Sequence, residues 1–221
     1  MTGVARRGRR PAVHHGVELR CGRRFEDEAR AAGHFVVAGV DEVGRGALCG
    51  PVVAGAVVLG DGFDDEGLDD SKRLTARQRE TLAARIRARA RAFAIGVAEP
   101  AEIDAVNILQ ATLVAMRRAL AALALAPDLV LVDALTIPGL AHEQQAIIKG
   151  DALSVSIAAA SIVAKVTRDA LMVELDAQHP GYGLARNMGY GCELHRDALR
   201  RMGPTPIHRR SFHGTQAWLF S

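Results

Sequence analysis

The chain has 221 residues, of which 49% are hydrophobic and only 4% aromatic, and its formal net charge is +3. A chain of this length forms a single domain with a core large enough to need no disulfide bonds. No apolar run approaches the ~18 residues of a membrane span, and polar sequence follows the basic N-terminus where a signal peptide has its apolar stretch. Composition therefore excludes membrane-spanning and disulfide-rich secreted proteins, and we expect a monomeric, cytoplasmic protein.

The charge is unevenly distributed along the chain. Residues 1–24 contain seven arginines and one glutamate, a net charge of +6, which leaves −3 for the remainder. We expect residues 1–24 to form a disordered basic tail whose arginines attract nucleic acid weakly and in a salt-sensitive way.

Hydrophobic patterning predicts strands before and between helices in a domain over residues 25–212, followed by a tail at 213–221. In chain order, the patterns indicate a short helix at 25–32, strands at 35–40 and 52–59, a helix opened by a capping box at Thr75 and Gln78, and a strand at 94–98. A long helix from Pro100, strands at 129–132 and 142–148, and helices at 152–177 and 193–202 follow. This order indicates an α/β protein with a mixed sheet and a helical C-terminal portion.

Acidic residues fall where predicted strands end and where a helix begins. Asp41 and Glu42 follow the first strand, Asp133 follows the strand at 129–132, and Asp151 precedes a helix. Neighbouring strands lie about 4.8 Å apart, so acids at their ends can converge, and clustered carboxylates suit Mg²⁺ or Mn²⁺. Each acid also has a local explanation, as the start of a loop, a turn residue or a helix N-cap.

An ordered set of motifs resembles the ribonuclease HII family, the type 2 ribonucleases H. The order and spacing hold over roughly residues 35–212, which makes the set far more specific than any single motif. Its members are GVDEVGRGALCGP at 39–51, Asp70-Ser71-Lys72, Glu102-Ile103-Asp104 with Asn107, Val132-Asp133, Lys149-Gly150-Asp151, IAAASIVAKVTRD at 157–169, Gly189-Tyr190-Gly191 with His195, and HRRSF at 208–212.

The resemblance implies a ribonuclease H-like fold, in which helices flank a central mixed sheet. It implies that two Mg²⁺ or Mn²⁺ ions are held by four catalytic acids, Asp41, Glu42, Asp133 and Asp151. It also implies that Gly44, Arg45 and Gly46 sense the 2′-hydroxyl of a ribonucleotide and that Tyr190 contacts the nucleotide that follows. Without the resemblance, the glycines would be interpreted as an ordinary turn and Tyr190 as a half-buried core residue.

Other polar residues are candidates for substrate contacts. Lys72 and Lys165 suit phosphate binding or neutralisation of the acids, although Lys165 can instead pair with Asp169 one helical turn away. Asn107 is a candidate contact to the DNA strand or a residue that hydrogen-bonds locally. For Arg209–Arg210, we favour connection of the C-terminal helices to the body over phosphate contact.

Soft metal ligands show no familiar spacing. Cys21, Cys49 and Cys192 are odd in number and far apart, so we interpret them as reduced thiols and not as a zinc site. His195 and His208 also form no metal-binding pair on any spacing that we recognise.

Three positions depart from the family pattern. Val43 and Ala47 stand where alanine and proline are common, and Ala134 stands where glycine usually follows the third acid. The alanine matters only if its backbone needs a positive φ, which would strain it. None of these departures removes an acid, so we expect the chain to be active.

The function implied is that of an endoribonuclease acting by in-line attack of a metal-bound water, leaving 3′-hydroxyl and 5′-phosphate ends. It would hydrolyse the RNA strand of RNA/DNA hybrids and cut 5′ of ribonucleotides embedded in duplex DNA, removing ribonucleotides and RNA primers during DNA replication and repair. Ribonuclease HIII has a similar core but an additional N-terminal substrate-binding domain, for which residues 1–34 are too few. A non-catalytic RNA/DNA hybrid-binding protein is the alternative of another class, and clustered acids disfavour it because binding alone favours basic groups.

A possible partner is indicated at the C-terminus. Gln216-Ala217-Trp218-Leu219-Phe220 resembles the short peptides that dock on bacterial replication sliding clamps. Packing of Trp218 and Phe220 against the body of the protein explains the same residues equally well.

Overall fold

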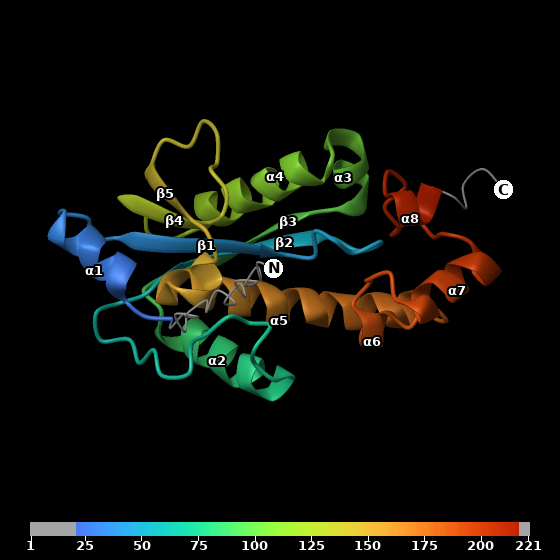
Figure 1. Cartoon of the computed structure of the whole chain (residues 1–221), viewed down its shortest axis with the longest axis horizontal. Coiled ribbons are helices and arrows are strands. Elements are labelled where there is room, and N and C mark those ends of the chain that lie inside the picture. The colour runs from blue at the N-terminus through green and yellow to red at the C-terminus, as the bar shows by residue number, and fades with distance from the viewer. Residues whose placement is uncertain (1–20, 217–221) are drawn as a thin grey trace, which may run out of the picture.

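The structure, a computed structural model, describes residues 21–216, whose five strands form one mixed sheet in the order β3-β2-β1-β4-β5 (Figure 1). The two central pairings differ, because β1 runs antiparallel to β2 and parallel to β4. This sheet confirms the expected α/β class. The strands are β1 (Val37–Val43), β2 (Val52–Val58), β3 (Ala92–Ala98), β4 (Leu129–Asp133) and β5 (Glu143–Ile147).

Helices cover both faces of the sheet. In Figure 1, α4 (Ile108–Ala121) lies over β2 and β3 on one face, while α5 (Val155–Gln178) runs along β1 and β2 on the other, with α2 (Ala76–Arg89) packed against α5. The shorter helices are α1 (Arg24–Ala31), α3 (Pro100–Val106), the 3₁₀ helix η1 (Gly150–Ala152), α6 (Leu184–Asn187), α7 (Glu193–Met202) and α8 (His213–Gln216). The last three gather beyond one end of the sheet and form the expected helical C-terminal portion.

Small residues bring α5 unusually close to the central strands. A Cβ on Gly39 would lie 2.1 Å from the carbonyl carbon of Ser156, and a Cβ on Gly55 would lie 2.4 Å from the carbonyl oxygen of Ala160. Both distances are far below a van der Waals contact, so only glycine fits these two positions. The close approach places the first half of α5 directly beneath the acidic part of β1.

Two predicted elements differ from the structure. The single long helix expected from Pro100 is wrong, because it is interrupted at Asn107, whose φ is 73° and whose side-chain oxygen accepts a hydrogen bond from the Gln110 amide at 3.1 Å as the N-cap of α4. The first strand also ends later than expected, because β2 pairs with Asp41 and Glu42 as well as with the apolar residues before them.

The chain ends differ in how much of them is described. Cys21–Arg24, which we assigned to the basic tail, contact the body: Gly22 forms a β-bridge with Ser154, and the Nε atom of Arg23 lies 2.7 Å from Oδ2 of Asp65. The rest of that tail, residues 1–20, lies outside the described residues, as do residues 217–221, which include all of the clamp-like peptide except Gln216. Among the described helices, none is long and apolar enough to cross a membrane.

Candidate active site

Two of the predicted acids meet because their strands are parallel neighbours. Val40 of β1 is level with Val132 of β4, so the residues that follow, Asp41 and Asp133, stand side by side at the same edge. Asp41 is only 5% exposed. The hydroxyl of Ser161 on α5 hydrogen-bonds to its carboxylate, which places Asp41 on the α5 face of the sheet.

The fourth acid reaches the same place from η1. The amide of Gly150 donates a hydrogen bond of 2.7 Å to Oδ1 of Asp133, which ties the end of β4 to the turn that carries Asp151. Asp151 is buried, and its Oδ2 accepts a hydrogen bond of 3.0 Å from the ammonium of Lys72. Lys72 therefore contacts an acid, as one of the two roles predicted for it requires.

The carboxylates repel one another in a poorly solvated environment. Burial, followed by the charges of Glu42 and Asp133, raises the pKa of Asp41 well above its usual value. Burial also raises the pKa of Asp133, with a further contribution from the negative charge of Asp151. The ionised form of each acid is thus less favourable than that of a free carboxylate when no cation is near, as expected of carboxylates arranged to bind one.

Glu42 gives the clearest sign that a cation fits here. Its Oε2 is buried and accepts no hydrogen bond from any described residue, while its Oε1 lies 3.2 Å from a guanidinium nitrogen of Arg45. Burial raises the pKa of Glu42, and the charge of Arg45 opposes that shift. A buried carboxylate oxygen without a partner costs free energy that a metal ion would recover.

The acids do not, however, form one tight cluster. Within residues 21–216, no three of them bring their ligand oxygens within 4.8 Å of one another, although another set of residues does. Two of the acids are instead paired with cations of the protein, Asp151 with Lys72 and Glu42 with Arg45.

The predicted substrate loop lies beside the acids, between β1 and β2. Gly44 has a φ of 94°, and a Cβ there would lie 2.1 Å from Nε of Arg168. Gly46 is different, because a Cβ there would have the Tyr190 ring as its nearest neighbour at 3.9 Å, an ordinary contact. Tyr190 is 39% exposed, so its ring and the exposed Gly46 face solvent together.

The remaining candidates have protein partners. Lys165 Nζ lies 2.7 Å from Asp169, so the alternative helical pairing is present. Asn107 caps α4, as described above. Arg209 is fully buried and donates to the carbonyls of Gly50 and Arg45, which confirms that it connects the C-terminal portion to the body.

Sequence reasoning missed two further features of this region. Arg168 is fully buried in α5 and donates to the carbonyl oxygens of Pro51, Met188 and Cys49. The sequence contained a signal for this role, because an arginine within an apolar helix is rarely buried unless other groups hold its charge.

The second missed feature is the grouping of three soft ligands. No spacing in the sequence relates Cys49 to His195 and His208, yet their potential ligand atoms lie within 4.8 Å of one another. The three residues meet only through the tertiary fold, which no spacing rule reveals.

Comparisons with known proteins agree with this geometry. The model of the family described as Ribonuclease HII matches residues 38–215. The Ribonuclease HII of Desulfitobacterium hafniense (strain Y51) is 54% identical over 196 residues, which are 89% of this chain and 75% of that protein.

Solved structures are similar as well. The ribonuclease H2 of Pyrococcus horikoshii OT3 has a TM-score of 0.69 and 31% identity, covering 82% of this chain and 95% of that one. The RNase HII in a complex with PCNA from Archaeoglobus fulgidus has a TM-score of 0.62 and 25% identity, covering 80% and 95%. The chain therefore belongs to the ribonuclease HII family of endonucleases, which cleave the RNA of RNA/DNA hybrids.

Proposed function

We propose that the protein hydrolyses the RNA strand of RNA/DNA hybrids and also cuts 5′ of single ribonucleotides embedded in duplex DNA, using two divalent metal ions. The proposal rests on the carboxylates gathered at one edge of the sheet, where Oε2 of Glu42 is buried and has no hydrogen-bond partner among the described residues. Directly beside them lies the exposed Gly46, which faces Tyr190. Ribonucleotide removal and RNA primer removal during DNA replication and repair would use this activity.

The metal site would be built from Asp41, Glu42, Asp133 and Asp151. Their hard carboxylate oxygens suit Mg²⁺ or Mn²⁺, which keep water and substrate phosphate among their ligands. When bound, such ions supply a nucleophilic water and stabilise the leaving 3′-oxygen, giving 3′-hydroxyl and 5′-phosphate ends. The protein contributes fixed ligand positions, because the Asp133–Gly150 hydrogen bond holds the third acid and the turn before the fourth together.

Lys72 would exchange partners as substrate binds. Its side chain is 78% exposed although its ammonium lies at Asp151, so it can leave the acid and approach a phosphate without breaking any packing. Arg45 stands in the same relation to Glu42, at 3.2 Å and with 42% of its side chain exposed. The two cations would therefore balance the acids in the free protein and the phosphates in the complex.

Recognition of the ribonucleotide would depend on close approach of its sugar. The 2′-hydroxyl is exposed in the wide minor groove of an A-like duplex and is the group that distinguishes RNA from DNA. An exposed glycine at position 46 lets backbone groups reach that hydroxyl, and the facing Tyr190 ring offers a surface for the adjacent nucleotide.

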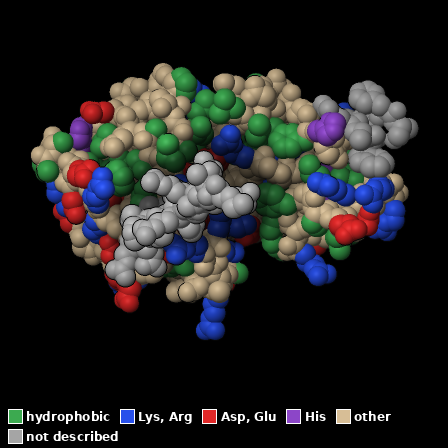
Figure 2. Space-filling model, in the orientation of Figure 1, with side chains coloured by type: hydrophobic (Ala, Val, Ile, Leu, Met, Phe, Trp, Pro, Cys, Tyr) green, Lys and Arg blue, Asp and Glu red, His purple; other side chains and the backbone are tan. Residues whose placement is uncertain are grey.

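Basic side chains at the C-terminal end suit contact with the phosphate backbone. Figure 2 shows Lys and Arg side chains gathered over α7. Arg196, Arg200 and Arg201 of that helix are exposed. Their contribution to binding would be independent of sequence and would decrease with salt.

A sliding clamp is the partner that we propose for the C-terminus. The structural relative from Archaeoglobus fulgidus is an RNase HII in a complex with PCNA, and residues 216–220 of this chain resemble clamp-docking peptides. Deleting residues 217–221 should abolish capture by an immobilised bacterial clamp while leaving hydrolysis of a free duplex unchanged. Equal capture of the full and shortened chains would exclude this docking site.

The decisive experiment uses duplex DNA that contains one ribonucleotide, incubated with magnesium, manganese or a chelator. We expect cleavage immediately 5′ of the ribonucleotide with a metal and none with chelator, while an all-DNA duplex remains intact. Tight binding without cleavage in either metal would instead favour the non-catalytic hybrid-binding protein.

A further inference from the structure

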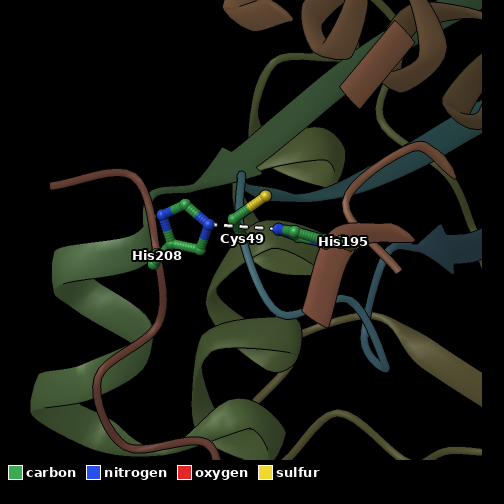
Figure 3. A group of neighbouring side chains, drawn as sticks. All are labelled: Cys49, His195 and His208. Carbon is green, nitrogen blue, oxygen red and sulfur yellow. Dashed lines mark hydrogen bonds between the residues drawn. The ribbon is translucent and has the colours of Figure 1, made fainter. Parts of the chain in front are cut away.

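The group formed by Cys49, His195 and His208 lies outside the acidic site. Figure 3 shows the two imidazole rings end to end, with a hydrogen bond of 3.1 Å between their Nε2 atoms and the Cys49 side chain beside them. All three residues are buried. Two explanations fit such a group: a metal ion held by one sulfur and two nitrogens, or a neutral pair of histidines joined by a proton.

Hydrogen bonds around the rings determine where the protons lie. The backbone amide of Thr205 donates to Nδ1 of His208 at 3.0 Å, so this nitrogen is an acceptor and a neutral His208 carries its proton on Nε2. That proton is donated to Nε2 of His195. A neutral His195 then carries its own proton on Nδ1, which lies 3.1 Å from the carbonyl oxygen of Tyr190 and donates to it.

This arrangement opposes a metal ion. The proton on Nε2 of His208 occupies the position that an ion would take. A proton moved to Nδ1 would be directed at the Thr205 amide, and only the Thr205 hydroxyl, 2.9 Å away, could accept it. The surroundings are also positive, because the buried Arg168 donates to the Cys49 carbonyl at 3.3 Å and the buried Arg209 follows His208 in sequence. A further cation would have to enter a region that already contains two buried guanidinium groups.

The hydrogen-bonded pair connects the substrate loop to the segment that carries Tyr190. Cys49 and His208 form an antiparallel β-bridge, and the amide of Leu48 donates to the carbonyl of Gly189 at 2.8 Å. Arg209 adds hydrogen bonds to the carbonyls of Gly50 and Arg45. The Tyr190 backbone is thus held through Gly189 on one side, and its own carbonyl accepts hydrogen bonds from the Cys192 amide at 2.8 Å and from Nδ1 of His195 at 3.1 Å.

We propose that His195 and His208 are positioning residues, whose neutral hydrogen-bonded pair fixes the Tyr190 carbonyl and so keeps the Tyr190 ring opposite Gly46, where a ribonucleotide is selected. This inference rests on the proposed function. Both rings are buried and their hydrogen bonds go to Tyr190, Thr205 and each other, not to the acids, so we expect the pair to affect binding and selectivity for the ribonucleotide and to leave the hydrolytic step unchanged.

Two substitutions at one position test the link to Tyr190. His195→Asn places an amide nitrogen near the position of Nδ1, so it can still donate to the Tyr190 carbonyl. His195→Gln places its amide near Nε2, where it meets His208 but cannot reach Tyr190. We expect KM for the single-ribonucleotide duplex to rise roughly tenfold in His195→Gln, which is the effect of losing one buried hydrogen bond, while kcat stays within about twofold of the wild-type value. In His195→Asn, KM should stay near the wild-type value.

Thermal unfolding of both variants separates positioning from simple core packing. Equal KM values in the two variants would overturn the proposal. So would a rise in KM that is accompanied by a matching fall in melting temperature or in kcat. Binding of the duplex by anisotropy, measured in an Asp41→Asn background, gives the same comparison without catalysis. If the wild type fails to cleave but the two variants still differ in duplex binding, the proposed function is refuted and the positioning role is not.

Zinc binding measures the competing explanation directly. Cys49→Ala should leave KM and kcat unchanged. After dialysis against zinc with excess magnesium, the wild type and Cys49→Ala should contain the same amount of zinc per chain. One zinc per chain that disappears in Cys49→Ala would overturn the neutral pair in favour of a metal site.

Discussion

A Cβ on Gly44 would lie 2.1 Å from Nε of Arg168, whereas a Cβ on Gly46, two residues later, would meet only the Tyr190 ring at 3.9 Å. The two glycines of one motif therefore serve different purposes. Gly44 makes room for a buried arginine that holds three backbone carbonyls, and its φ of 94° strains any other residue. Gly46 has space within the protein, so any need for glycine there comes from the substrate.

The two alanine variants should accordingly fail in different ways. We expect Gly44→Ala to lower the melting temperature, by several degrees, because Arg168 must move and a left-handed backbone is strained. Gly46→Ala should melt like the wild type yet raise KM for the single-ribonucleotide duplex by tenfold or more, because its methyl group meets the sugar. Normal KM in a stable Gly46→Ala protein would remove this glycine from the recognition site.

Removing one acid should separate stability from activity. In Asp41→Asn and Asp133→Asn, cleavage should fall by at least about 100-fold because a metal ligand is lost. The metal-free proteins should nevertheless melt at or above the wild-type temperature near pH 7, since burial and neighbouring charges raise the pKa of both acids and make their ionised forms unfavourable. Calorimetry in chelator and a cleavage assay in magnesium measure the two effects, and undiminished cleavage would contradict the assignment.

The sequence was sufficient to predict the sheet and the acids, because these depend on local patterns. Runs of buried valine specify β2, and the capping box of Thr75 and Gln78 forms as expected, with the Gln78 side chain 2.9 Å from the Thr75 amide. The acids were singled out because they come at the ends of apolar runs and stand in family motifs. The pairing of Asp151 with Lys72 was not visible in local patterns, because the two residues are 79 positions apart in the sequence.

Features built from distant segments escaped prediction. The buried guanidinium of Arg209 meets the carbonyl of Gly50, 159 positions earlier, and the rings of His195 and His208 meet only because α7 and the following loop fold back on residues 48–50. Neither contact has a periodicity or a spacing in the sequence. The break at Asn107 was missed for another reason, because a polar residue within an apolar helical pattern gives no sign that its φ is positive, here 73°.

Ala134 is the departure from the family pattern that has a structural consequence. Its φ is 51°, in the left-handed region, where alanine pays a steric cost that glycine avoids. Ala134→Gly should therefore stabilise the protein by about 1 kcal/mol at most, because the added flexibility of glycine in the unfolded chain offsets part of the gain. Urea denaturation measures the change, and Ala47→Gly, at a buried position without positive φ, is a control that should destabilise.

The histidine pair should make stability depend on pH below neutrality. Burial, followed by the charge of His195, lowers the pKa of His208 to about 4, and burial also lowers the pKa of His195. An unfolded histidine titrates near pH 6.5, so between about pH 6.5 and pH 4 the unfolded chain binds more protons than the folded one. Stability from this pair is thus complete above pH 6.5 and is lost as the pH falls.

Neighbouring groups determine how the effect is measured. Cys49, Tyr182, His179 and the two buried arginines surround the rings, and none of them is an acid that could hold a protonated imidazole. Asp41 and Asp133 act with the opposite sign, because their raised pKa values make ionisation destabilising as the pH rises. We therefore compare wild type with His208→Gln, which keeps a donor toward His195 but cannot titrate. Their difference in urea midpoint should shrink from pH 7 to pH 4.5, and a constant difference would show that the pair does not titrate on unfolding.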